Sequence, residues 1–477
     1  MASKITILGA GPGGYVAAIR AAQLGAEVTL VEADQVGGTC LNRGCIPSKV
    51  LITTAALLEK FHRAESFGVK VDGRVSPDLA KLMDRKKNVI QGQIKGILGL
   101  LKRHKIRLCT GIGQITGPGK IRVTPRKGDE IDLDWDRLIL ATGTEPLNIP
   151  AFPFDGKKII SSDHVLALEE IPESVLILGG GVIGCEFAFI LSSLGARVTV
   201  VEALSRLLPL PSVDESCSKI LQREMKKRRI RVLVDKTVAD YAEDGAGLKV
   251  TVGPSPFLEN PSDKDNTLQS LEVDKMLVCI GRHPNSAGLG LENIGIETDE
   301  KGWIAVDEHM QTDAENIYAV GDILGPPKVM LAHVASAEGL VAAENAMGAN
   351  YRVDYHAVPG AIFTSPEVAN VGLTEAQAKE RGVACEAHQV LMRTLGKAQV
   401  MGELAGEARV IVESDSGRIL GIHLVGAHVT ELIAEGTLAV QHGMTVNDIV
   451  ATIHAHPTLA EIMLEVAHKA KGYAIHG

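Results

Sequence analysis

Two cysteines lie close enough in the sequence to react with each other. Four residues separate Cys40 from Cys45 within the segment GGTCLNRGCIPSK, residues 37–49. If both lie in the first turns of a helix that opens near Thr39, their thiols are one to two turns apart and form a disulfide with modest backbone distortion. The positive end of the helix dipole stabilises a thiolate there. The pair therefore predicts thiol–disulfide redox chemistry.

Two other interpretations of this pair stay open. A zinc site would need further ligands at matching spacing, and none stands near the pair, so we expect no metal site. An inert pair of thiols is the second alternative. The other cysteines stand singly, which argues against the disulfide framework of a secreted protein and favours a reducing cytoplasm. They are Cys109, Cys185, Cys217, Cys279 and Cys385.

A repeated glycine-rich unit surrounds the cysteine pair and must position it. Residues 9–32 align without gaps with residues 179–202, an offset of 170, and eleven of the 24 positions are identical. Each copy follows a short apolar strand, opens a helix at its third glycine and returns to a strand that ends in glutamate. This β-α-β order predicts two related Rossmann-like units with parallel sheets, and so an α/β fold.

The glycine spacing in each copy fits a dinucleotide. Gly9 makes the tight turn, Gly11 lets the backbone approach a pyrophosphate, and Gly14 allows the helix to pack closely against the strand. Glu32 ends the second strand, where a carboxylate accepts hydrogen bonds from a ribose. The second copy repeats these elements at Gly179, Gly181, Gly184 and Glu202.

The order of the motifs assigns a dinucleotide to each unit. The first unit is followed at once by Cys40 and Cys45, which must lie beside a flavin ring, so it should bind FAD. The second unit should then bind the nicotinamide nucleotide. Glu202 would accept a hydrogen bond from a free 2′-hydroxyl and repel a 2′-phosphate, which favours NAD over NADP. Binding of NADP through Arg206 is the alternative.

Further sequence patterns predict helices, strands and loops in the rest of the chain. We expect a helix at residues 89–105, buried strands at 135–142, 275–281 and 316–322, and a solvated loop at 253–266. From about residue 346 the sequence has no nucleotide motif.

These elements divide the chain into domains. The expected domains are an FAD-binding domain (1–150), an NAD-binding domain (151–275), a central domain that completes the FAD site (276–345) and a C-terminal α+β domain (346–477).

Composition excludes several classes of partner. The net charge of −9 argues against binding to nucleic acid or to an anionic membrane. No stretch approaches the roughly 18 consecutive apolar residues of a membrane helix. The first apolar strand, at residues 5–8, begins too early for a signal peptide, so we expect a cytoplasmic protein. Its partners should be small molecules or other proteins.

The whole chain resembles the pyridine nucleotide disulfide oxidoreductase family. The two fingerprints, CLNRGCIPSK, the GD of residues 321–322 and the terminal HAHPTLAE of residues 454–461 stand in family order. Within the family it is similar to the branch that oxidises dihydrolipoamide with FAD and NAD. The resemblance implies that Cys45 faces the flavin and that Cys40 meets the dithiol substrate. It also implies an ion pair of Lys49 and Glu186 near the flavin and nicotinamide.

The resemblance further implies an active-site base, His456, oriented by Glu461. Chemistry agrees, because a thiol with a pKa near ~8.5 is mostly protonated at neutral pH and a dithiol substrate needs a base. His454 is the alternative histidine and could be a packing residue. The implied nucleotide contacts include Lys49, Thr142, Gly143 and Asp322 for FAD and Gly281 for NAD.

The same resemblance implies the partners. We expect a homodimer formed by the C-terminal domain, with each active site shared between subunits, and a lipoyl-bearing E2 or H-protein of a multienzyme complex. Glutathione reductases of this family bind NADP through arginines, and mercuric reductases carry a C-terminal cysteine pair, whereas this chain has no cysteine after Cys385. His283 departs from the second arginine that family members often have. A flavoprotein without turnover is a further alternative.

Overall fold

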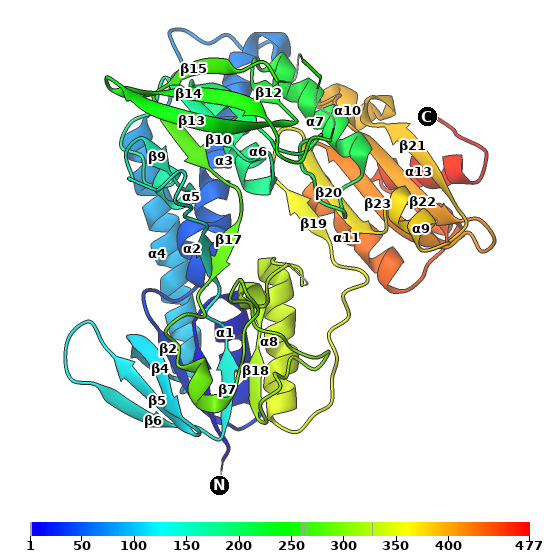
Figure 1. The fold of residues 1–477 in the computed structure, drawn as a ribbon. Coiled ribbons are helices and arrows are strands. Elements are labelled where there is room, and N and C mark those ends of the chain that lie inside the picture. Colours follow the sequence, from blue (N-terminus) through cyan, green and yellow to red (C-terminus); the bar gives the residue numbers. More distant parts are fainter. Residues whose placement is uncertain (1, 260–261, 264–265, 327) are drawn as a thin grey trace.

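The first glycine-rich unit forms a parallel sheet. The structure is a computed structural model that describes residues 2–259, 262–263, 266–326 and 328–477. Five parallel strands stand in the order β18-β7-β1-β2-β3 (Figure 1). Their bounds are β1 (Lys4–Leu8), β2 (Glu27–Glu32), β3 (Arg107–Thr110), β7 (Arg137–Leu140) and β18 (Ile317–Ala319). β7 and β18 lie within the expected strands 135–142 and 316–322.

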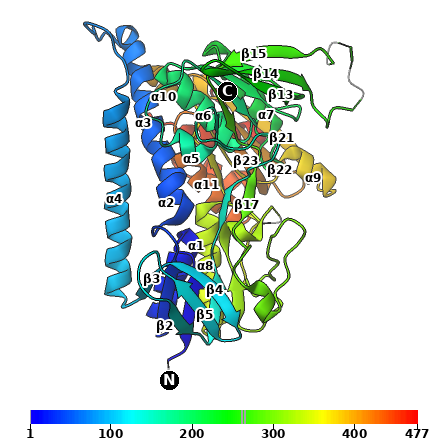
Figure 2. The same ribbon diagram turned by 60° about the vertical axis from the view of Figure 1, so that its left-hand side comes forward.

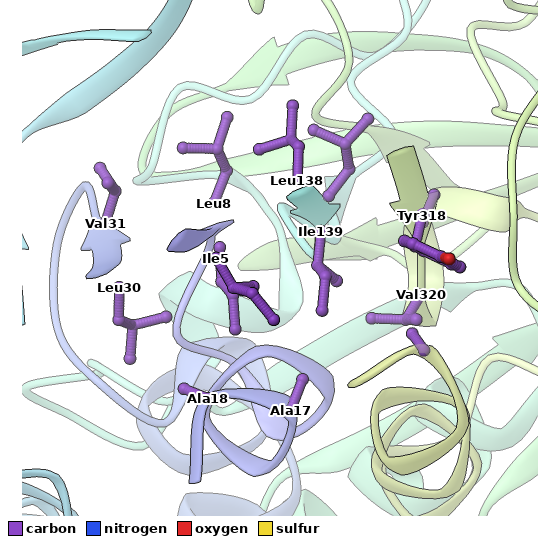
Figure 3. Close-up of a cluster of buried hydrophobic side chains, with 14 of the residues drawn as sticks. Ile5, Leu8, Ala17, Ala18, Leu30, Val31, Leu138, Ile139, Tyr318 and Val320 are labelled. Carbon is purple, nitrogen blue, oxygen red and sulfur yellow. The ribbon is translucent and has the colours of Figure 1, made fainter. Parts of the chain in front are cut away.

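Small residues bring the first helix close to this sheet. Ala17 and Ala18 of α1 are fully buried in one apolar cluster with Ile5 and Ile139 of the sheet (Figure 3). The helices of this part are α1 (Pro12–Gln23), α2 (Gly38–Arg43), α3 (Cys45–His62), the 3-10 turn η1 (Ala64–Phe67) and α4 (Leu79–Arg103). A three-stranded antiparallel sheet is added by β4 (Ile112–Gly117), β5 (Lys120–Thr124) and β6 (Ile131–Asp134).

Two expected helices differ from those observed. The cysteines do not share one helix: Cys40 lies in α2, whereas Cys45 is the first residue of α3. The chain breaks at Gly44, where an added Cβ would lie 3.0 Å from the carbonyl oxygen of Thr39. The helix expected at 89–105 starts ten residues earlier, because Asp78 caps α4 by accepting a hydrogen bond from the Lys81 N–H at 3.0 Å. Figure 2 shows α4 along the outer edge of the molecule.

The second unit repeats the parallel arrangement. Its strands stand in the order β12-β11-β10-β16-β9. The bounds are β9 (Ile159–Ile160), β10 (Ser174–Leu178), β11 (Arg197–Val201), β12 (Arg231–Leu233) and β16 (Lys275–Val278), with α5 (Ser162–Val165), α6 (Val182–Leu194) and α7 (Glu215–Lys227). An antiparallel sheet contains β13 (Lys236–Asp244), β14 (Gly247–Pro254) and β15 (Gln269–Val273). The expected loop 253–266 begins inside β14, and residues 260–261 and 264–265 lie outside the described residues.

The chain between the second unit and residue 346 returns to the first sheet. β18 pairs with β7, and residues 289–346 contribute to the same apolar core as β1 and α1. The elements here are β17 (Arg282–Pro284), which pairs with β8 (Thr144–Pro146), the 3-10 turns η2 (Leu291–Ile294) and η3 (Gly321–Leu324), and α8 (Ala332–Ala346). The division of the chain at residues 150, 275 and 345 stays a prediction.

An antiparallel sheet of five strands, in the order β19-β20-β23-β22-β21, organises the C-terminal part. Its strands are β19 (Gly360–Ile362), β20 (Glu367–Gly372), β21 (Cys385–Leu391), β22 (Glu407–Glu413) and β23 (Ile419–Gly426). The helices are α9 (Glu375–Glu380), α10 (Gly396–Met401), α11 (Val429–Gln441), α12 (Val446–Ala451) and α13 (Glu461–Ala470), with the 3-10 turn η4 (Met392–Thr394). In the described part of the chain, no helix is both long and apolar enough to cross a membrane.

One polar cluster ties the three parts together. Glu59 of α3 accepts a hydrogen bond from Ser193 of α6 at 2.7 Å and forms an ion pair with Arg228 at 3.3 Å. The Arg228 guanidinium also donates to the Ser365 hydroxyl, just before β20, at 2.8 Å. The thiol-bearing helix is therefore anchored to both of its neighbours.

Candidate active site

The two cysteines of the α2–α3 turn are free thiols that interact with each other. A hydrogen bond from Cys40 lowers the pKa of Cys45 to about 7, and the Lys49 ammonium adds to this effect against the opposing effect of burial. The same hydrogen bond raises the pKa of Cys40. Cys45 also lies at the N-terminus of an 18-residue helix, whose dipole stabilises a thiolate. Cys45 is therefore the thiol of the pair that gives up its proton more readily.

An ion pair joins this helix to the second unit. Lys49, one turn after Cys45, contacts both carboxylate oxygens of Glu186 on α6, at 3.1 and 3.0 Å. The backbone N–H of Phe363 also donates to Glu186, at 3.0 Å, and the Lys49 ammonium lies 4.2 Å from the centre of the Phe363 ring. Sequence reasoning did not single out Phe363, which follows β19 of the C-terminal part.

The two glycine loops have the backbone geometry that a dinucleotide needs. An added Cβ at Gly14 would lie 1.8 Å from the Gly9 carbonyl oxygen, and one at Gly184 would lie 1.9 Å from that of Gly179. Only glycine therefore fits at both helix–strand crossings. The N-caps of α1 and α6 are the middle glycines of the two loops, and no side chain caps either helix. Their first N–H groups are left to bind a phosphate, so the loops fit FAD and NAD.

The glutamates that end the second strand of each unit make matching contacts. Glu32 accepts hydrogen bonds from the N–H groups of Ala10 and Asp34, at 2.7 and 2.8 Å. Glu202 accepts from Gly180 and Leu204, at 2.6 and 2.8 Å. Each carboxylate is thus fixed beside its glycine loop, where a ribose would lie.

Arg206 does not approach Glu202 as the NADP alternative would require. Its guanidinium donates to the carbonyl oxygens of Leu208, Leu210 and Val213 and to the Ser218 hydroxyl, at 2.8–3.1 Å. Through these hydrogen bonds Arg206 holds the segment that follows it, up to Ser218.

Asp322 lies in a polar group that joins η3 to β8 and β17. Burial raises the pKa of Asp322, while Arg282 and the hydrogen bond from the Thr144 hydroxyl, at 3.3 Å, oppose the rise. Arg282 donates to the Thr144 hydroxyl at 2.6 Å. The residue after β17 holds the turn after β7: the Thr142 hydroxyl donates a hydrogen bond to the Asn285 carbonyl oxygen at 2.9 Å. Thr144, Arg282 and Asn285 are residues that sequence reasoning missed.

The neighbouring glycines have backbone conformations that suit these turns. Gly143 has a φ of +65° and accepts a hydrogen bond from the Asn285 N–H at 2.9 Å. Gly281, with a φ of +139°, accepts from the Leu147 N–H at 3.1 Å. Gly143 and Gly281 therefore stand at opposite ends of the β8–β17 ladder, and the carbonyl of each extends that ladder by one hydrogen bond.

A buried glutamate on α8 supports the Asp322 turn. Glu338 is 1% exposed and accepts hydrogen bonds from the Gly321 N–H and the Tyr355 hydroxyl, both at 2.7 Å. Sequence reasoning also missed this residue. The only available signal was an acidic side chain in an otherwise small and apolar helix.

The expected base and its partner form a hydrogen-bonded pair. His456 Nδ1 lies 2.8 Å from Glu461 Oε1, and the Thr458 N–H donates to the other Glu461 oxygen at 2.8 Å. Burial works to raise the pKa of Glu461, but the hydrogen bonds from His456 and Thr458 outweigh it and leave that pKa below its usual range. The His456 side chain is 75% exposed. His454, in contrast, is 5% exposed and bonded to Glu435.

The structure brings some of the expected residues together and leaves others apart. Cys40, Cys45, Lys49 and Glu186 gather at the α3–α6 junction. His456 lies just before α13, and Figure 1 shows α2 and α13 on different sides of the molecule. No hydrogen bond or ion pair among the described residues joins His456 to either cysteine.

Comparison with known proteins identifies the family. Residues 3–339 match the family described as Pyridine nucleotide-disulphide oxidoreductase, and residues 358–467 match its dimerisation domain. The chain belongs to this family. It is 41% identical over 481 residues to the dihydrolipoyl dehydrogenase of Bacillus subtilis, covering 99% of this chain and 98% of the relative. It is 40% identical over 470 residues to that of Chlamydia pneumoniae, covering 98% and 97%.

A solved structure of LpdA from Mycobacterium tuberculosis has the same fold. It superposes with a TM-score of 0.88 and 29% identity, covering 98% of this chain and 99% of LpdA. Membership of the pyridine nucleotide-disulphide oxidoreductase family confirms the expected fold class, the enzyme class and the cofactors FAD and NAD. The match to the dimerisation domain supports a homodimer.

The contacts of Glu202 lead to a prediction about coenzyme choice. Replacing Glu202 with glutamine removes the charge that repels a 2′-phosphate and weakens the bond to a 2′-hydroxyl. The ratio of kcat/KM for NADP+ to that for NAD+ should rise by the equivalent of about 1–3 kcal/mol. Glu215→Gln, which removes an exposed charge from the same unit, serves as the control. A wild-type protein that prefers NADP+ would contradict the assignment.

The hydrogen bond between the cysteines leads to a prediction about pH. In Cys40→Ser the hydroxyl still donates to Cys45, so the pKa of Cys45 should stay near 7. In Cys40→Ala the donor is lost, and the pKa should rise toward the ordinary value of ~8.5. The measurement is the rate of Cys45 alkylation against pH, read from the modified peptide. Equal midpoints in the two variants would show that Cys40 does not stabilise the thiolate.

Proposed function

We propose that the protein oxidises a dihydrolipoyl dithiol to its cyclic disulfide and reduces NAD+ in turn. The observation that carries this proposal is the Cys40–Cys45 pair, in which Cys45 has the lower pKa and lies one turn before the Lys49–Glu186 ion pair. In this proposal thiol chemistry takes place where α3 of the first unit meets α6 of the second, and the Lys49–Glu186 ion pair supports it. The oxidised protein would hold the pair as a disulfide.

The reaction begins with proton transfer from the substrate. Because His456 Nδ1 is bonded to Glu461, Nε2 is the free ring nitrogen that accepts a proton from one substrate thiol. The substrate thiolate attacks the Cys40 sulfur, the Cys40–Cys45 bond breaks, and Cys45 leaves as a thiolate. The second substrate thiol then attacks the mixed disulfide. The products are the cyclic substrate disulfide and a reduced pair, with Cys40 free again.

The residues around the reduced pair prepare it for oxidation. FAD, when bound, supplies a two-electron acceptor for the dithiol and a hydride donor for NAD+. Lys49 and the N-terminus of α3 stabilise negative charge at Cys45, and Glu186 fixes the position of Lys49. In this proposal FAD is bound by Gly9, Gly11, Gly14, Glu32, Lys49, Thr142, Gly143 and Asp322, and NAD by Gly179, Gly181, Gly184, Glu202 and Gly281.

The proposal extends to the partners of the reaction. The lipoyl group would arrive on the E2 component of a 2-oxo acid dehydrogenase complex or on the H-protein of a glycine cleavage system. Free thiols at all seven cysteines favour a cytoplasmic location. The exposed His456 would meet the thiol pair of a second subunit, because its own chain carries that pair elsewhere (Figure 1).

Replacement of either cysteine tests the reaction. Cys40→Ser and Cys45→Ser should keep FAD, because the fold needs neither sulfur, and should lose dihydrolipoamide oxidation by about a thousandfold or more. The assay measures NADH formation from dihydrolipoamide. Cys109→Ser, which changes a buried thiol outside the site, is the control.

The same assay separates the alternatives within the family. Turnover of NADPH with glutathione disulfide or with mercuric ion that exceeds turnover of dihydrolipoamide with NAD+ would refute the proposal. A variant of Cys40 or Cys45 that keeps more than about a tenth of wild-type turnover would refute the dithiol relay.

Mixed dimers test whether two subunits share each site. A dimer of one Cys45→Ser chain and one His456→Gln chain has an intact thiol pair in one subunit and an intact histidine in the other. If each site takes these groups from different chains, the mixed dimer regains one working site of two. Its turnover should approach about half of wild type, while both parent homodimers stay nearly inactive. Separately tagged chains allow the mixed dimer to be purified; if it is as inactive as its parents, each site lies within one chain.

A further inference from the structure

A cavity lies apart from the residues of the proposed redox site. It has a volume of about 370 Å³ and lies between the segment before α8, residues 355–360 and the C-terminal sheet. This volume falls within the range of small-molecule sites, about 300–1,000 Å³. None of the residues that we expect in the redox site lines the cavity.

Most of the cavity wall is apolar. Leu331, Val358, Leu373, Leu420 and Val440 contribute to it, so an occupant with an apolar body would be desolvated there. The cavity lining also includes arginine side chains, whereas the protein as a whole has a net charge of −9.

The charged residues of the lining are all basic. These are Arg381 and Arg418, and no aspartate or glutamate among the described residues lines the cavity; His356, which also lines it, is bonded to Asp354 at 2.6 Å. Arg418 forms an ion pair with Glu413 at 3.1 Å. Arg381 has no carboxylate within ion-pair distance among the described residues. The cavity therefore offers one guanidinium that is free to bind an anion.

A buried amide points to a missing polar partner. Asn370 of β20 lines the cavity and is 4% exposed. Its side chain packs against Gly360, where an added Cβ would lie 2.5 Å from the amide oxygen, and forms no hydrogen bond with any described residue. The amide atoms are not shut off from solvent, so water in the cavity can hydrate them and an occupant can replace that water. An occupant with a polar group would satisfy Asn370.

We propose that this cavity binds a small organic anion with one carboxylate and an apolar chain. The carboxylate pairs with Arg381 and accepts a hydrogen bond from the Asn370 amide, and the chain packs against the leucine and valine wall. Arginine suits this role because its planar guanidinium matches the two oxygens of a carboxylate. The occupant would touch β19, which ends one residue before Phe363 and its hydrogen bond to Glu186.

A series of carboxylates tests the proposal on the purified holoprotein. Titration calorimetry with acetate, butyrate and hexanoate should show affinity that rises about fourfold for each added methylene, as ~0.8 kcal/mol per buried CH₂ implies. Hexanol, which has the same chain without the charge, should bind at least ten times more weakly than hexanoate. Inorganic phosphate, which has the charge without the chain, should bind weakly as well.

Two pairs of variants place the binding in this cavity. Arg381→Gln should weaken hexanoate binding at least fivefold. Lys379→Gln, which removes a charge from the end of the preceding helix α9 and lines a different surface, should leave it unchanged. Asn370→Leu should abolish binding by filling the cavity with an apolar side chain, and Asn370→Asp should weaken it through repulsion. Dihydrolipoamide oxidation should be unchanged in the Arg381 and Lys379 variants, which shows that they are folded.

Several results would overturn the proposal. These are no binding of any carboxylate, equal binding of hexanol and hexanoate, binding of phosphate alone, or equal effects of Arg381→Gln and Lys379→Gln. Because the cavity shares no residue with the redox site, a wild-type protein that binds no carboxylate but has full redox activity would count against this proposal alone.

Discussion

The ion pair between Lys49 and Glu186 constrains the rest of the site. Glu186 is 6% exposed, and a buried carboxylate without its partner is costly by several kcal/mol, so the two helices that carry the pair must keep one relative position. Cys45 lies one turn from Lys49, and α6 begins at the second glycine loop. Because Phe363 also bonds to Glu186, the C-terminal part is held to the same point. A single contact therefore fixes the thiol pair against both dinucleotide-binding units.

The two units share one backbone arrangement, a glycine loop followed by a helix without a side-chain cap. Each glycine loop leaves uncapped N–H groups at a helix N-terminus, and each ends in a glutamate held by two backbone N–H groups. Their surroundings then differ. The first unit continues into the cysteine helices, whereas in the second unit Arg206 is engaged within its own loop. Similar local geometry thus recurs in both units, while the chain segments next to the two loops are different.

The C-terminal part has a different physical role. Its antiparallel sheet carries no glycine loop, and it presents His456 to solvent while Glu461 fixes the orientation of the ring. The His456 ring is therefore held in one orientation but remains largely exposed. The match to a dimerisation domain fits this arrangement, because it indicates that a second subunit packs against this part of the chain.

The sequence by itself determined the features that depend on neighbours along the chain. Glycine spacing, strand patterns and the interval between Cys40 and Cys45 predicted both units and a pair of interacting thiols, because these are local properties of backbone geometry. The break at Gly44 and the early start of α4 were missed, although Asp78 was a visible cap signal. Tertiary structure alone decided the contacts of Glu338, Arg282, Asn285 and Phe363 and the cavity at Asn370. Most of these contacts join residues more than a hundred positions apart, and local pattern carries no information about which distant side chains folding will bring together.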